Sequence, residues 1–221
     1  MKIYQFIQNY SIEILDEPFA LDNGNELNQT ANITFTDINN NLIEKKKYGV
    51  IDIVDIYEKI NNGSAVDVSQ CFVKDFSLSK YRRKYKLKSS DRIDLLNFTA
   101  TDALFESEKT VDFSLANFTG KKADFTNTHF GSGNLSFLKA EFGNFPVSFK
   151  GSSYSEGNNN FQYVKFNNGK VTFENATFEN GNLSFINTYF GDGNVSFKNV
   201  HFGNGDVSFA FTTFNKGNIT F

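Results

Sequence analysis

Aromatic residues recur through the second half of this 221-residue chain at alternating intervals of five and seven residues. The series runs without a gap from Phe113 to Phe221 and consists of eighteen Phe and one Tyr, Tyr154. The repeating unit is therefore twelve residues long, and it occurs nine times. A fixed period of this kind is typical of solenoids, in which each unit buries its apolar face against its neighbours.

Other columns repeat in step with the aromatics. The residue two positions earlier is mostly branched or long before the seven-spaced aromatics, as at Leu135 and Val147, with Asn159 as a polar exception, and mostly small before the five-spaced ones, as at Ala116 and Ala140. Residues two apart on a strand share a face, so both columns point inward and the residue between them points outward. Before the seven-spaced aromatics this outward residue is mostly a hydroxyl, and we expect a solvated strand face with cross-strand pairs. The hydroxyls are Ser136, Ser148, Thr172, Ser184, Ser196, Ser208 and Thr220.

Glycine forms a further column, three residues after the five-spaced aromatics. Recurrence at one turn position predicts a positive φ, where a Cβ would cost energy. Its members are Gly133, Gly157, Gly169, Gly181, Gly193, Gly205 and Gly217. Each unit is then a strand, a tight corner, a second strand and a longer Gly-Asn corner.

Ala116-Asn117-Phe118 and Ala123-Asp124-Phe125 resemble the pentapeptide-repeat family, and Val66-Asp67-Val68 and Cys71-Phe72-Val73 keep the same five-residue step upstream. The resemblance covers about residues 64–221 and implies a right-handed quadrilateral β-helix with four pentapeptides to a coil. The Gly-Asn insertion departs from that pattern and would make each four-faced coil two twelve-residue units long. A two-faced coil of a single unit stays open; four faces are favoured because stacked sheets lie only about 10 Å apart, which is narrow for opposed phenyls.

Residues 1–63 differ in composition and predict a small capping domain ahead of a solenoid over 64–221. Strands are expected at 3–7, 11–15 and 31–35, and a helix at 51–60, with Gly63 just beyond its end. A solenoid must hide its open backbone edge, so this domain is predicted to cover the first coil. The predicted fold class is mainly β: a right-handed parallel β-helix with an N-terminal α+β cap.

The net charge and the residue content disfavour several classes of function. The net charge is −3, which disfavours a nucleic-acid binder, and no apolar run is long enough to span a membrane. The single cysteine, Cys71, suits a reducing compartment, so a cytoplasmic location is predicted. Cys71 is expected to be buried, and His129 and His201 to be solvated. No catalytic residue, metal site or cofactor is predicted.

The densest charge run is Lys80-Tyr81-Arg82-Arg83-Lys84-Tyr85-Lys86-Leu87-Lys88. It interrupts the five-residue step, so we expect a protruding loop within 80–92. A solvated loop is the plain interpretation; binding of an anionic partner, with phosphates gripped by cations and bases stacked on Tyr, is the alternative. The cations concerned are Lys80, Arg82, Arg83, Lys84, Lys86 and Lys88.

The favoured function is a structural or protein-interaction module with an unidentified protein partner. The resemblance also implies a second possibility, mimicry of DNA that protects DNA gyrase, but residues 111–221 contain eight acidic and eight basic residues, too balanced for that role. An enzyme is least favoured. Because the repeat runs to Phe221 and leaves no room for a cap, we expect a homodimer through the C-terminal coils; the alternative is a longer protein whose next coils supply the cover. The predicted contacts of the dimer are Phe209, Phe214, Ile219 and Phe221.

Overall fold

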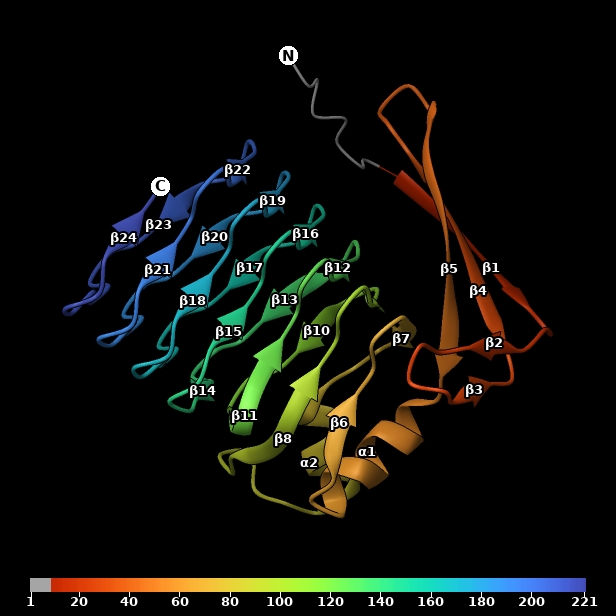
Figure 1. The fold of residues 1–221 in the computed structure, drawn as a ribbon, viewed down its shortest axis with the longest axis horizontal. Coiled ribbons are helices and arrows are strands. Elements are labelled where there is room, and N and C mark those ends of the chain that lie inside the picture. The colour runs from red at the N-terminus through yellow and green to blue at the C-terminus, as the bar shows by residue number, and fades with distance from the viewer. Residues whose placement is uncertain (1–8) are drawn as a thin grey trace.

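The computed structural model describes residues 9–221, so the strand expected at 3–7 lies outside the described residues. The chain forms a mainly β solenoid of about seven turns with two helices. Figure 1 shows the coils stacked side by side, with the helices at the N-terminal end of the stack and the C-terminus at the other. Within 9–221 no helix is both long and apolar enough to span a membrane.

From Val111 onward, each coil consists of two twelve-residue units. Val147 pairs with Val171, which pairs with Val195, all in parallel register, so residues two units apart occupy the same place on successive coils. The coil therefore has four faces, which is the geometry that the sequence favoured over the two-faced coil. The thin coil of a single unit is excluded because residues one unit apart lie on opposite sides of the core.

Three columns of strands and one line of single bridges define the four faces (Figure 1). Face 1 consists of β7 (Cys71–Lys74), β9 (Leu104–Glu106), β12 (His129–Phe130), β16 (Ser153–Tyr154), β19 (Thr177–Phe178) and β22 (His201–Phe202). Face 2 consists of β10 (Thr110–Asp112), β13 (Asn134–Ser136), β17 (Asn159–Asn160), β20 (Leu183–Ser184) and β23 (Val207–Ser208). Face 3 contains β14 (Glu141–Phe142) and a line of single bridges through Glu141, Lys165, Tyr189 and Thr213. Face 4 consists of β6 (Ala65–Asp67), β8 (Ile93–Thr99), β11 (Ala116–Asp124), β15 (Val147–Ser148), β18 (Val171–Thr172), β21 (Val195–Ser196) and β24 (Ile219–Thr220).

The inward assignment of the aromatics is confirmed. Rings one coil apart stack face to face: the Phe113 and Phe137 centroids are 4.7 Å apart with an interplanar angle of 3°. Columns on opposite faces meet edge to face across the core, as Phe137 and Phe149 do at 5.6 Å and 87°. Both arrangements are favourable for aromatic quadrupoles, at about 0.5–1.5 kcal/mol per pair beyond the area buried. The interior is thus filled by four continuous stacks of rings.

The outward polar residues have a further role that was not expected. In eight tight corners the side chain of this residue accepts the backbone N–H two residues further on, at 2.9–3.5 Å. Short oxygen-bearing side chains favour this local turn, which explains why only Asp, Asn, Ser and Thr appear there. The acceptors are Asp112, Asp124, Ser136, Ser148, Asn160, Thr172, Ser196 and Ser208. Cross-coil hydroxyl pairs also occur, between Ser114 and Ser136 and between Thr126 and Ser148.

The positive φ predicted for the glycine column was wrong. The left-handed conformation falls instead on the tight corner, at residues such as Asn127 and Asn175. Glycine recurs because successive coils touch there: a Cβ on Gly181 would lie 1.9 Å from the carbonyl oxygen of Gly157. Beside it, the backbone N–H of one residue in the Gly-Asn corner donates to an Asn side-chain oxygen one coil earlier, as Asn182 donates to Asn158 at 3.0 Å. The inserted pair therefore joins coil to coil.

The N-terminal part is an antiparallel sheet of β1 (Asn9–Leu15), β4 (Thr30–Thr36) and β5 (Leu42–Ile51), with a small hairpin of β2 (Phe19–Ala20) and β3 (Glu26–Leu27). Strand β5 then pairs in parallel with β7, so this sheet continues into face 1. Helix α1 (Ile53–Asn61) follows, with Asp52 as its N-cap and Ile56, Tyr57 and Ile60 buried. Strands β1 and β4 and helix α1 lie close to the ranges expected at 11–15, 31–35 and 51–60, whereas β2, β3 and β5 were not predicted.

A second, outer core was not foreseen. The β1–β4–β5 sheet lies over the outer surface of face 1, where Ile33, Phe35 and Tyr48 pack on Phe72 and Leu104. His129 lies at the margin of this contact, only 4% exposed and flanked by the rings of Tyr10 and Phe35. The prediction that His129 is solvated was therefore wrong, because the outer surface of face 1 is partly covered.

Candidate interaction surfaces

The basic segment is a helix rather than a protruding loop. Helix α2 (Leu78–Lys84) begins at Ser77, whose hydroxyl accepts the backbone N–H of Lys80 at 3.2 Å. Leu78 and Tyr81 are buried, and the Tyr81 ring meets that of Tyr57 from α1 at 5.4 Å. Two helices therefore cover the first coil. The apolar positions at 78, 81 and 85 have helical spacing, a signal hidden by the density of charge around them.

Arg82 does not face solvent. Its side chain is 3% exposed, its Nε donates to the carbonyl of Asp91 at 2.7 Å and its Nη2 to that of Ser114 at 2.6 Å. These bonds attach α2 to the solenoid, so Arg82 is removed from the set of cations available to an anionic partner. The other members of that set, Lys80, Arg83, Lys84, Lys86 and Lys88, are not buried.

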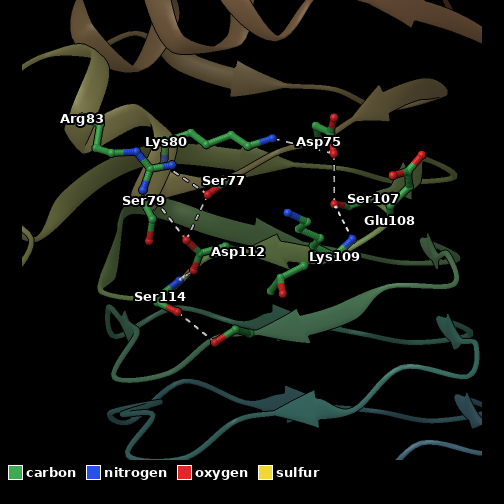
Figure 2. Close-up of a pocket in the computed structure, with 12 residues that line it drawn as sticks. Asp75, Ser77, Ser79, Lys80, Arg83, Ser107, Glu108, Lys109, Asp112 and Ser114 are labelled. Carbon is green, nitrogen blue, oxygen red and sulfur yellow. Dashed lines mark hydrogen bonds and ion pairs between the residues drawn. The ribbon is translucent and has the colours of Figure 1, made fainter.

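Helix α2 and the coil beneath it form a groove of about 490 Å³ (Figure 2). Lys80 and Arg83 line it from the helix and Lys109 from the solenoid, opposite the carboxylates of Asp75 and Glu108 and that of Asp112 at its floor. Lys80 Nζ lies 3.8 Å from Asp75. With three cations and three carboxylates, the groove has no excess positive charge with which to select an anion.

Asp112 holds the start of α2. Its carboxylate accepts the Ser77 hydroxyl at 3.1 Å and the backbone N–H groups of Ser79 and Ser114 at 3.0 and 2.9 Å (Figure 2). Burial, the largest single influence, raises the pKa of Asp112, but the hydrogen bonds from Ser114 and Ser79 together outweigh it, and the pKa is lowered. The polar residues of this groove thus serve to join α2 to the solenoid.

The last coil presents apolar groups to solvent. Phe209, Phe214 and Phe221 each stack on the ring one coil earlier, at 5.0, 4.8 and 5.2 Å. No ring of residues 9–221 covers their other faces, so Phe221 is 70% and Ile219 40% exposed. Two exposed residues of this coil, Phe211 and Val207, did not figure in the predicted self-association set. Phe211 lies at a tight corner with φ of 56°, and nothing in the sequence indicated that a Phe would occupy this left-handed position.

Groups able to do chemistry are sparse in the described part of the chain. Cys71 is buried as expected, and burial raises the pKa of its thiol to about 12, which leaves it unreactive. Residues 9–221 bring no three His, Cys, Asp or Glu together in a group able to hold a metal ion. His129 and His201 lie on the same face, three coils apart.

Comparison with protein-family models gave no match for the chain. Comparisons with curated proteins and with solved structures likewise gave none.

Proposed function

We propose that the protein is a rigid scaffold for protein interaction, without a catalytic site, and that it self-associates through its last coil. The observation that supports this most is the contrast between the two ends of the rod. Helices α1 and α2 cover the first coil, whereas the rings of Phe209, Phe214 and Phe221 have one open face each. The interior is packed with rings, which leaves the ends and outer faces as contact surfaces.

Self-association would continue the packing already present in the rod. The last rungs β22, β23 and β24 each pair on one side only within the described chain, so their free N–H and C=O groups are open to another strand. A second copy related by a two-fold axis would place its own four ring stacks against these. Such an interface closes on itself and does not propagate into filaments.

The solenoid is proposed to be a variant of the pentapeptide-repeat design. Four five-residue segments and two inserted Gly-Asn pairs account for the spacing between paired strands such as β15 and β18. A cytoplasmic location forms part of the same proposal, supported by the single buried thiol, Cys71.

Light scattering of the 221-residue chain at tens of micromolar tests the interface, with a dimer expected for the wild type. Ile219→Lys should give a monomer, because it places a charge in the centre of the contact. The matched control is Leu87→Lys, which alters a side chain of nearly equal exposure, 41% against 40%, at the capped end. A wild-type mass of one chain would contradict self-association, and a dimer of the Ile219→Lys variant would place the contact elsewhere.

A further inference from the structure

The N-terminal sheet covers an apolar strip on the outside of the solenoid. Along face 1 the outward residues run from Phe72 and Leu104 to His129, and then to Ser153 and Thr177. The first two pack under Ile33, Phe35 and Tyr48 and are at most 5% exposed. The strip therefore changes from apolar to polar at His129, where the β1–β4–β5 sheet ends its contact with the rod.

The margin of this cover is a small buried polar cluster. His129 Nδ1 lies 2.6 Å from the Ser153 hydroxyl, and Nε2 lies 3.5 Å from that of Ser155. The Tyr10 and Phe35 rings meet the imidazole edge to face, at 5.5 and 5.1 Å. These contacts are compatible with a neutral imidazole, and they enclose the ring almost completely.

Tyr10 fastens the cover from the other side of the cluster. Its hydroxyl donates to the Glu106 carboxylate of β9 and accepts the backbone N–H of Ser132 at 2.8 Å. Beyond Ser155, Glu156 lines the same cleft as Tyr10 and Glu106. The cleft thus joins β1 to the solenoid through polar contacts, next to the apolar outer core.

Among the described residues, no carboxylate is hydrogen-bonded to His129. Lys46 of β5 acts on the ring and opposes a positive charge on the imidazole. The Glu106 carboxylate is engaged by Tyr10 and Ser132. Burial of the ring, and then Lys46, lowers the pKa of His129 to about 3. A proton on this imidazole would place an unpaired charge inside the contact, which is strongly unfavourable.

We propose that the β1–β4–β5 sheet is an acid-released cover, with His129 as the group that releases it. Protonated His129 leaves the interface, β1 and β4 detach while the β5–β7 pairing holds, and Phe72 and Leu104 become available to an apolar surface of another molecule. This goes beyond the proposed function, since Phe72 and Leu104 lie at the N-terminal end of face 1, away from the last coil.

The direction follows from linkage. The folded pKa is below the ordinary value of 6.5, so the covered state is fully stabilised above pH 6.5 and loses that stability as pH falls toward 3. Taking pKa values of about 3 covered and 6.5 released, the ratio of released to covered protein should rise about thirty-fold between pH 7.5 and pH 5.

Amide hydrogen exchange read by mass spectrometry on the full chain tests this. After correction for the intrinsic effect of pH, exchange in residues 30–36 should rise about thirty-fold from pH 7.5 to pH 5. Exchange in 171–196, inside the rod, should not rise. An equal rise in both segments, or none in 30–36, would overturn the proposal.

Three variants separate His129 from other titrating groups, each compared by its own ratio of exchange rates at the two pH values. His129→Gln should remove the rise even if it loosens the cover at both pH values. Glu106→Gln should keep the rise, because the trigger is the imidazole. His201→Gln, three coils along the same face, is the matched control and should also keep it. A rise that persists in His129→Gln, or that disappears in Glu106→Gln, would refute the assignment.

Discussion

Replacing Phe185 by alanine removes one ring from the middle of a stack. The ring is fully buried and lies 5.0 Å from both Phe161 and Phe209 in its own column. It also meets Phe173 and Phe197 at 5.6 and 5.8 Å. Removing a buried phenyl costs about 3–5 kcal/mol, and most when the cavity cannot collapse. Because the coil spacing is fixed by backbone hydrogen bonds above and below, we expect a value near the upper end of that range.

Urea denaturation followed by far-ultraviolet circular dichroism measures this loss. The matched control is Ser184→Ala, which changes the neighbouring residue on the outward side of the same strand. The Ser184 hydroxyl has no hydrogen-bond partner among the described residues although it is buried, so its removal should change the free energy of unfolding by no more than about 0.5 kcal/mol. Equal effects of the two substitutions would refute the assignment of Phe185 to the interior and of Ser184 to the outer side.

Two further predictions concern contacts between coils. Gly181→Ala should destabilise the solenoid by more than about 1 kcal/mol in the same assay, because its Cβ would meet the Gly157 carbonyl oxygen; a neutral effect would show that the coils can separate there. Burial, and then Glu156, raises the pKa of Glu179 to about 8. The stability that the protonated carboxyl contributes is present below pH 4.5 and lost as pH rises through 8, by at most about 1.4 kcal/mol for each pH unit in that interval. Glu179→Gln should flatten the urea midpoint between pH 5 and 9; an unchanged profile would show that Glu179 is ionised throughout.

The solenoid could be predicted from sequence because its periodicity is geometric. Side chains two residues apart, such as Leu135 and Phe137, can both be buried only if successive side chains of the strand point alternately inward and outward. The repeat places apolar residues at that spacing. The coil length remained open because a twelve-residue repeat fits either one coil or half of one. The spacing alone does not reveal that Val147 pairs with Val171, two repeats further along the chain.

The cap surfaces were harder to predict because their contacts are not periodic. Arg82 is buried by carbonyl groups of Asp91 and Ser114, which only the folded chain brings near it. His129 belongs to a polar-looking column, and nothing local shows that Phe35 covers it. One signal was available: Phe72 and Leu104 are apolar at outward positions, whereas Ser153 and Thr177 are polar one and two coils beyond His129. Apolar residues on an outer face require a cover.

The two halves of each coil have the same pattern of inward residues, and this has a consequence for how such a rod can change length. A duplication or loss of one twelve-residue unit would leave every ring column filled, since Phe137 and Phe149 occupy equivalent places half a coil apart. All later residues would nevertheless turn to the opposite side, so that face 2 would carry what had been on face 4. Insertion or loss of half a coil therefore moves the later surface residues to the opposite face without changing the core. Only insertion or loss of a whole coil preserves both the core and the faces on which the surface residues lie.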